Sequence, residues 1–355
     1  MKILFASNFN YLPQRTGGSE SSTNDLCIAL LERGVEVAVI CSLGMFDAVW
    51  IANRIASKLS GYKFVQDRRL PYPVFRGYNV KKGIPEVIKR FPPDIVVVQA
   101  GLPFELVNIF SAMKIPVVLY ARDIEFQRNT EPLELNRYVG FIANSKFTAS
   151  RLADLLAIHA LVLPPLVDPE IYRVESSRET VVHVGLAQEK GIEISFALAG
   201  RRPDIPFRFI ESWPVSKNEF IGYQERAKEL RNVEILRRST NMKEFYGRAS
   251  VLLAPSLCEE AWGRVVTEAQ FSGIPVIASD RGGLPESVGA GGLIVPHEAN
   301  IERWDHALSL LWDKSEVYSS ISAAALERSR QEDISKEVVI DKFISYLHSH
   351  ILSLI

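Results

Sequence analysis

The chain has 355 residues, which is too long for one ordinary hydrophobic core and about right for two domains. Hydrophobic residues make up 47% and charged residues 23%, a composition that excludes an intrinsically disordered chain. The formal net charge of -1 creates no overall field that attracts nucleic acid, so we expect no nucleic-acid partner, and any anion site must be local.

Three cysteines, Cys27, Cys41 and Cys258, form no C-x-x-C pair and leave an odd count. This argues against a disulfide framework or a zinc site and favours a reducing compartment. The N-terminal residues enter a strand-like pattern without a signal-peptide cleavage pattern. No apolar run approaches the roughly 18–20 residues that span a bilayer. We therefore expect a cytoplasmic protein.

Short β-branched runs alternate with helix-length amphipathic stretches in the first half of the chain. A strand is predicted at 3–6, a helix at 19–32 that ends before Gly34, and a strand at 35–40. Further buried strands are predicted at 95–98, 117–120 and 141–143, with helical segments between them. Continuous apolar strands separated by helices indicate a parallel sheet that is covered on both faces.

The same pattern restarts after a proline-rich stretch at 164–180, which reads as a linker. Strands are predicted at 181–184, 207–210, 233–236, 251–254 and 275–278, and helices at 192–199 and 242–248. Asn241 followed by Glu244 predicts a capping box at the start of the last helix. Two such arrays would place a cleft between two sets of strand carboxyl ends, where ligands bind in open α/β sheets.

One segment in the second half carries most of the chemical information. It reads PSLCEEAWGRVVTEAQFSGIPVIASDRGGLPE over residues 255–286. A loop with Glu259 and Glu260 leads into a helix that begins at about Arg264, and a second turn at 280–283 opens another short helix. The N-terminus of each helix presents free N–H groups and partial positive charge, which suit phosphate.

Glycines in this segment, Gly263, Gly282 and Gly283, would let a ligand approach the main chain closely because no Cβ intervenes. Glu260 lies in the loop and Glu268 eight residues later in the helix. The two carboxylates can therefore meet different parts of one extended ligand.

This segment resembles the retaining glycosyltransferases of family 4, whose signature is E-x7-E, then G-x-P-V-I-A-S and a G-G turn. The match runs from Glu260 through Glu268 to Glu286. The resemblance implies a GT-B fold, in which two Rossmann-like domains face each other across a cleft. It also implies that Glu260 contacts the donor sugar and that Glu268 binds the ribose. The alternative is that both are ordinary solvated glutamates.

The resemblance extends over nearly the whole chain. It implies that Gly17 and Gly18, between the first strand and the first helix, pack against the donor diphosphate, although two such glycines are also common in plain turns. The segment Ala143-Asn144-Ser145-Lys146-Phe147 resembles a structural element of the family at the last strand of the first domain. Pro164 to Asp168 resembles the start of the interdomain linker.

Lys190, in the run Glu189-Lys190-Gly191 that follows Val184-Gly185, resembles the family's lysine that grips the donor phosphates. An ammonium group serves well as a point charge for phosphate, and a surface lysine is the alternative. The family resemblance divides the chain into an acceptor domain at 1–170, a nucleotide-sugar donor domain at 171–334, and a C-terminal helix at 335–355 that returns to the first domain.

Two positions depart from the family pattern. Leu186 stands where the family usually has an arginine, so one phosphate contact is missing or comes from elsewhere, with Arg264 and Arg281 as candidates. Arg122 precedes Asp123 where a histidine is common. Arg122 either contacts an anion of the donor or acceptor or is a structural arginine paired with Asp123.

Residues 63–90 are rich in cations with aromatic residues between them. The cations are Lys63, Arg68, Arg69, Arg76, Lys81, Lys82, Lys89 and Arg90, and the aromatic residues are Tyr62, Phe64, Tyr72, Phe75 and Tyr78. Two interpretations stay open. The first is a peripheral contact with the inner face of a membrane or with a phosphate-bearing acceptor, and the second is a solvated loop and helix face. His183 is expected in the core, and Trp213 and Trp304 in packing.

The resulting hypothesis is a retaining glycosyltransferase that moves a sugar from a nucleotide-diphosphate sugar to a glycan, lipid-linked or small-molecule acceptor. No D-x-D triplet is present, so neither a metal nor another cofactor is expected. Catalysis is expected of Glu260, Lys190, Arg122 and Asp123. Donor binding is expected of Gly17, Gly18, Lys190, Glu260, Trp262, Gly263, Arg264, Glu268, Gly282 and Gly283. The alternatives are a nucleotide-sugar epimerase or hydrolase on the same fold, and a nucleotide-sugar-binding protein with altered catalysis.

Overall fold

The computed structural model describes residues 1–354 and divides into two compact units. The first unit comprises Met1–Leu166 together with the C-terminal segment from Lys336, and the second comprises Val167–Ser335. These divisions lie near the boundaries expected after residues 170 and 334. The roles of acceptor and donor domain remain predictions.

The first unit is built on one sheet, which has eight strands within the described residues, in the order β3-β4-β2-β1-β5-β6-β7-β8. All neighbouring strands are parallel except β3 and β4. The strands are β1 (Lys2–Asn10), β2 (Glu36–Ser42), β3 (Val65–Asp67), β4 (Val74–Gly77), β5 (Ile95–Gln99), β6 (Val117–Ala121), β7 (Val139–Ala143) and β8 (Leu161–Val162). The central strands are almost entirely buried, as the valine- and isoleucine-rich runs predict.

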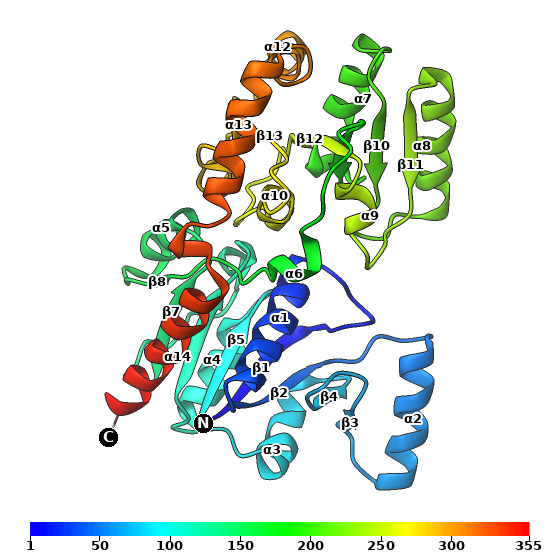
Figure 1. Cartoon of the computed structure of the whole chain (residues 1–355). Coiled ribbons are helices and arrows are strands. Elements are labelled where there is room, and N and C mark those ends of the chain that lie inside the picture. The colour runs from blue at the N-terminus through cyan, green and yellow to red at the C-terminus, as the bar shows by residue number, and fades with distance from the viewer. Residues whose placement is uncertain (355) are drawn as a thin grey trace. The chain divides into compact units, whose positions relative to one another are not determined.

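Helices cover both faces of this sheet (Figure 1). They are α1 (Gly18–Glu32), α2 (Ala48–Ser60), α3 (Val80–Arg90), α4 (Phe104–Ala112), α5 (Lys146–Leu156), the 3-10 turn η1 (Glu125–Arg128) and the C-terminal α14 (Lys336–Leu352). α14 packs beside α1, where the ring of Phe343 stacks on that of Phe5 with 6.3 Å between the centroids. On the opposite face, α3, α4 and α5 bury their apolar sides.

The second unit holds a parallel sheet, with six strands within the described residues, in the order β11-β10-β9-β12-β13-β14. The strands are β9 (Thr180–Val184), β10 (Phe207–Ile210), β11 (Val233–Leu236), β12 (Ala249–Ala254), β13 (Val276–Ser279) and β14 (Gly292–Val295). The helices are α6 (Pro169–Tyr172), α7 (Ile192–Arg201), α8 (Lys217–Leu230), α9 (Lys243–Tyr246), α10 (Arg264–Gln270), α11 (Leu284–Val288), α12 (Ile301–Trp312) and α13 (Ser315–Arg328), with 3-10 turns η2 (Gln188–Lys190) and η3 (Glu332–Ile334).

Most predicted strands match the structure to within two residues at each end, and Trp304 is fully buried as expected. Three expectations were wrong in detail. The predicted linker contains α6, and β7 is followed by one more strand, β8. The predicted capping box also fails. α9 begins after Met242, which makes no side-chain cap, and the Asn241 side chain bonds to the Glu244 side chain instead of a backbone N–H.

Candidate active site

Two loops meet at the carboxyl end of the sheet in the second unit. One follows β9 and contains η2, and the other follows β12 and leads to α10. The backbone N–H groups of Leu257 and Cys258 both donate to the carbonyl of Glu189, at 2.9 and 3.2 Å. Gly191 has φ +75, and a Cβ there would lie 2.0 Å from the carbonyl oxygen of Pro255. Only glycine tolerates both the left-handed backbone and this close approach.

This contact brings together the two residues expected to do most of the chemistry, Lys190 and Glu260. The ammonium of Lys190 donates to Oε1 of Glu260 at 2.5 Å, and the Ser256 hydroxyl donates to the same oxygen at 2.9 Å. Both side chains are mostly buried, with 14% of Lys190 and 19% of Glu260 exposed. Burial is the largest single influence and lowers the pKa of Lys190, but the charge and hydrogen bond of Glu260, together with Cys258 and Glu189 nearby, outweigh burial and raise the pKa. Lys190 is therefore a fully charged ammonium at neutral pH.

Trp213, on the loop after β10, was expected to be a packing residue, and the structure corrects this. Its side chain is 43% exposed, and the Lys190 ammonium lies 4.8 Å from the centre of its ring. The face of an indole attracts a cation and leaves the ammonium's donors available. Trp213 therefore belongs to the candidate site as a neighbour of Lys190. A single aromatic residue in a loop belongs to no sequence pattern from which its contact with Lys190 could be predicted.

Gly282 and Gly283 pack against Glu260 itself. Gly282 has φ +64, and a Cβ there would lie 2.2 Å from the carbonyl oxygen of Glu260. The N–H of Gly283 donates to that same carbonyl at 2.6 Å. The contact that explains Gly282 is thus one within the protein, whereas the sequence suggested contact with a ligand. The glycine turn holds the Glu260 loop in place.

Glu268 lies on α10 in a buried polar cluster. Only 5% of the residue is exposed, its Oε1 accepts from Nε of Arg264 at 2.9 Å, and its Oε2 accepts from the Tyr246 hydroxyl at 2.8 Å. The guanidinium of Arg264 also donates to the Tyr172 hydroxyl at 2.8 Å. Arg264 therefore neutralises Glu268. This pairing explains why an arginine occupies position 264 of α10 without any contact to a phosphate.

The remaining predicted residues of this segment differ in their access to solvent. The indole of Trp262 is buried, and its N–H donates to the Thr267 hydroxyl at 3.0 Å, so the side chain is part of the core. A Cβ at Gly263 would lie 2.4 Å from Cδ2 of Leu284, so this glycine also serves packing. The guanidinium of Arg281 donates to the Leu257 carbonyl at 2.9 Å.

Gly17 and Gly18, expected at the donor diphosphate, lie in the first unit. Gly17 is the N-cap of α1 and offers no side-chain cap. A Cβ built on Gly18 would meet no atom within 4 Å. Packing within the unit therefore gives no reason for a glycine at position 18, in contrast to Gly282. A ligand that approaches the first turn of α1 would give such a reason.

Arg122 and Asp123 follow β6 and have different partners. A terminal nitrogen of Arg122 lies 3.3 Å from both the Ser19 carbonyl and the Thr23 hydroxyl of α1, and its guanidinium stacks over the Tyr120 ring at 4.2 Å. These contacts tie Arg122 to α1, and its expected catalytic role stays a prediction. Asp123 accepts from the N–H of Gly101 at 3.2 Å and from that of Glu125 at 3.0 Å. Burial raises the pKa of Asp123 to about 6.

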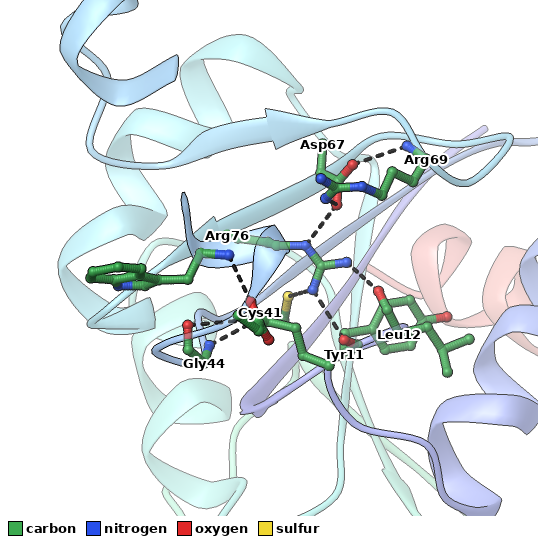
Figure 2. Close-up of polar contacts among 10 residues, drawn as sticks. Tyr11, Leu12, Cys41, Gly44, Asp67, Arg69 and Arg76 are labelled. Atoms are coloured by element: carbon green, nitrogen blue, oxygen red, sulfur yellow. Dashed lines mark hydrogen bonds and ion pairs between the residues drawn. The ribbon is translucent and has the colours of Figure 1, made fainter. Parts of the chain in front are cut away.

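A buried arginine holds the loop before Gly17. Arg76, on β4, has no exposed surface, and its Nε donates to Asp67 at 3.0 Å. Its terminal nitrogens donate to the backbone carbonyls of Tyr11, at 3.1 Å, and of Leu12 (Figure 2). A guanidinium suits this task because its donors reach several acceptors in fixed directions. The side chain of Gln14, in the same loop, donates to both carboxylate oxygens of Asp47.

This network changes the interpretation of the basic stretch at 63–90. Arg76 is internal, and Phe64, Tyr72 and Phe75 are buried, whereas Tyr62 and Tyr78 are exposed. Several other cations already have partners. Arg69 pairs with Asp67, Lys81 with Glu105, and Arg90 with Glu86. For the remaining cations, the membrane or acceptor contact and the solvated face both stay predictions. No helix within residues 1–354 is long and apolar enough to cross a membrane.

Sequence reasoning missed Ser256, Trp213 and Arg76 as parts of these sites. His183, by contrast, is a core residue as expected. It is buried between the Gly185 carbonyl and the Ser195 hydroxyl, and burial lowers its pKa to about 4. In the described part of the chain, no group of three or more His, Cys, Asp or Glu residues is placed to hold a metal ion.

Comparison with known proteins identifies the family of the chain. The family model "Glycosyltransferase Family 4" matches residues 16–171, and "Glycosyl transferases group 1" matches residues 170–328. A D-inositol 3-phosphate glycosyltransferase of Corynebacterium glutamicum (strain R) is 31% identical over 204 residues, which cover 48% of this chain and 47% of that protein. The chain spans about half or less of the length of the curated relatives that it matches.

Solved structures share the fold over nearly their whole length. Anabaena HepE in complex with UDP and glucose aligns with a TM-score of 0.75 at 17% identity, over 98% of this chain and 100% of that one. Sucrose-phosphate synthase from Thermosynechococcus elongatus also aligns at 0.75, with 14% identity and 98% of each chain covered. Both units of the chain thus have the Rossmann-like architecture of GT-B proteins, and the chain belongs to glycosyltransferase family 4.

Proposed function

We propose that the protein is a retaining glycosyltransferase that takes its sugar from a nucleotide-diphosphate donor bound in the second unit. The observation that carries this proposal is the Lys190–Glu260 pair at the carboxyl end of a parallel sheet, the place where ligands bind in such sheets. A buried, fully charged ammonium beside a carboxylate suits a ligand that combines phosphates and a sugar. The complex of the fold relative HepE with UDP and glucose supports the same class of donor.

In this proposal, the donor diphosphate takes over the ammonium of Lys190 from Glu260. Negative charge then grows on the leaving phosphate as the glycosidic bond breaks, and Lys190 stabilises it electrostatically. Glu260, released from Lys190 but still bonded to Ser256, accepts from hydroxyl groups of the donor sugar. Glu268 accepts from the ribose while Arg264 and Tyr246 hold its carboxylate in place.

The first unit would supply the remaining groups. Gly17 and Gly18 would let phosphate approach the start of α1, where the first N–H groups of the helix are free to donate. Asp123, with its raised pKa, is the candidate to exchange a proton or accept a bond from the sugar or the acceptor. The structural contacts of Arg122 make it a support for α1 and for the loop of Asp123, in place of the histidine common in the family.

We also propose that the reaction needs no metal ion. Lys190 and the helix starts would supply the positive charge that a divalent cation supplies elsewhere. Leu186, which replaces the family's arginine, is buried and cannot substitute for it. The acceptor would be a carbohydrate, a lipid-linked sugar or a small molecule such as the inositol phosphate named for the matched relatives. Three free cysteines support a reducing compartment such as the cytoplasm.

The test is a screen of nucleoside diphosphates and their sugars by thermal stabilisation, followed by turnover of each stabilising donor with and without candidate acceptors. A ligand that binds only the native state raises the unfolding temperature. Transfer of the sugar with retention of anomeric configuration supports the proposal. Consumption of the donor without an acceptor would support an epimerase or hydrolase, and tight binding without any product would support a binding protein.

A further inference from the structure

Three neighbouring strands of the second unit end at the same edge of its sheet. β12, β13 and β14 are adjacent and parallel, so the segments that follow them start side by side. These segments are the Glu260 loop (256–260), the glycine turn (280–283) and a short segment that contains His297. The third segment belongs to no motif of the sequence, yet its contacts lead to the Lys190–Glu260 pair.

Leu257 links the glycine turn to the loops of both residues of this pair. Its carbonyl accepts from Nε of Arg281 at 2.9 Å, and its N–H donates to the carbonyl of Glu189 at 2.9 Å. Glu189 directly precedes Lys190, and Leu257 lies in the same loop as Glu260. Arg281 therefore fixes the point at which the loops of the two charged side chains meet.

The side chain of His297 bridges Asp280 and Arg281. Its Nδ1 lies 2.8 Å from Oδ1 of Asp280, and the same oxygen accepts from the backbone N–H of His297 at 2.9 Å. Its Nε2 lies 3.5 Å from a terminal nitrogen of Arg281. Burial raises the pKa of Asp280, but the hydrogen bonds and charge of His297 outweigh burial and lower the pKa. Asp280 is therefore an ionised carboxylate, also in mildly acidic solution.

These two partners assign the hydrogens of the imidazole. An ionised carboxylate only accepts hydrogen bonds, and a guanidinium only donates them. Nδ1 of His297 must therefore carry the hydrogen that Asp280 accepts, and Nε2 must present its lone pair to Arg281. The neutral ring alone meets both requirements. A second proton, on Nε2, would set two donors and two positive charges against each other at 3.5 Å.

We propose that neutral His297 is a positioning residue that holds the Glu260 loop through Arg281, and that protonation of His297 loosens this loop. Protonation keeps the bond to Asp280 but replaces the bond to Arg281 by repulsion. Glu298, the other charged group beside the ring, lies 3.8 Å from Nε2 and offers a partner for a hydrogen there. An imidazole commonly changes its charge between about pH 5 and 8, so the change falls in an accessible range.

The expected size of the effect follows from exposure. The side chain of His297 is 32% exposed and that of Asp280 is 41% exposed, so water screens part of the repulsion. The loop should therefore loosen by a few-fold and should not unfold. The effect on sugar transfer rests on the proposed function, but the effect on the loop can be measured without any substrate.

Amide hydrogen exchange of the full chain tests the effect on the loop. The probes are the N–H groups of Leu257 and Cys258, which both donate to the carbonyl of Glu189. After correction for the pH dependence of chemical exchange, their protection in the wild type should be about three- to tenfold lower at about pH 5.5 than at about pH 8, the worth of roughly one hydrogen bond. His297→Gln stays neutral, so its protection should change by less than about twofold between the same pH values.

The matched control is His306→Gln, which removes an exposed histidine of α12 in the same unit and should keep the pH dependence of the wild type. Arg281→Ala should show low protection at both pH values, because the contact that protonation weakens is then already absent. A pH dependence that persists in His297→Gln, or wild-type protection in Arg281→Ala, would overturn the proposal.

Steady-state kinetics with a donor identified by the thermal screen gives the second readout. The ratio of kcat in His297→Gln to kcat in the wild type should rise by about three- to tenfold between about pH 8 and pH 5.5. Asp123 titrates in both proteins and cancels. The same ratio for His306→Gln should stay constant. Loop protection that follows His297 in a chain that transfers no sugar would support the positioning role and refute only the proposed function.

Discussion

The ammonium of Lys190 lies 2.5 Å from Oε1 of Glu260, so the residue expected at the donor phosphates and the residue expected at the donor sugar neutralise each other. The pair forms because Gly191 and the carbonyl of Glu189 bring the loop after β9 against the loop after β12. In the proposed function, a donor diphosphate would compete with Glu260 for Lys190, and the same event would free Glu260 for the sugar. Binding of the donor and alignment of the Glu260 carboxylate would then be coupled through one exchange of partners.

Replacement of Glu268 by glutamine should weaken binding of donor and free nucleoside diphosphate alike. The expected loss is roughly 1.5–3 kcal/mol, because the contact with ribose is a charge-assisted hydrogen bond that is similar in the ground and transition states. The variant also leaves Arg264 with less negative charge beside it, so its free energy of unfolding must be measured separately. Calorimetric titration below the unfolding temperature reports the affinity. An unchanged nucleotide affinity would remove Glu268 from the ribose site.

Two glycine-to-alanine variants should behave in opposite ways. Gly282→Ala forces a Cβ to within 2.2 Å of the Glu260 carbonyl in a left-handed backbone, and it should destabilise the protein by roughly 2 kcal/mol or more. Gly18→Ala meets no atom, so its stability should stay within about 0.5 kcal/mol of the wild type. If phosphate approaches the start of α1, Gly18→Ala should still weaken nucleotide binding. Denaturant unfolding measures the stability of the two variants, and calorimetry measures their nucleotide affinity. Wild-type affinity in Gly18→Ala would indicate that Gly17 and Gly18 form only a turn.

The sequence predicts much of the fold because buried parallel strands are continuous apolar runs, and both sheets consist mainly of such strands. The resemblance to family 4 also singles out Lys190 and Glu260 as site residues. It does not predict their ion pair, which depends on a contact between loops some 70 residues apart. The sequence does not predict the burial of Arg76 either, because its acceptors are the backbone carbonyls of Tyr11 and Leu12, and every residue has a backbone carbonyl.

The ionisation of Asp123 should affect stability above pH 4. Because burial raises its folded pKa to about 6, above the unfolded value of about 3.9, the stability it contributes is fully present below pH 3.9 and is lost as the pH rises through 6. Asp123→Asn stays neutral, so between pH 4.5 and 7.5 it should gain roughly 2 kcal/mol of unfolding free energy relative to the wild type. His183, with its lowered pKa, titrates in both proteins and cancels. Equal pH dependence of the two proteins would show that Asp123 ionises normally.

Chelation should leave turnover intact. Lys190 and the helix starts supply positive charge to the diphosphate in this account, so kcat before and after EDTA should agree to within about twofold. The assay requires a donor identified by the thermal screen. A drop of more than about tenfold that Mg²⁺ or Mn²⁺ restores would mean that a metal ion carries the charge assigned to Lys190.

The most direct test of the central claim is steady-state kinetics of Glu260→Gln beside its matched control Glu259→Gln, with Lys190→Ala for comparison. Glu260→Gln should lower kcat by about 10²-fold or more and affect nucleoside diphosphate affinity far less, because Glu260 acts at the sugar. Lys190→Ala should lower both kcat and the affinity for nucleoside diphosphate, because phosphate charge is present in the bound donor and grows in the transition state. Glu259→Gln, in the same loop, should resemble the wild type. A near-normal kcat in Glu260→Gln, or an equal loss in Glu259→Gln, would contradict the account, and the Lys190–Glu260 pair would then be a structural contact between two loops.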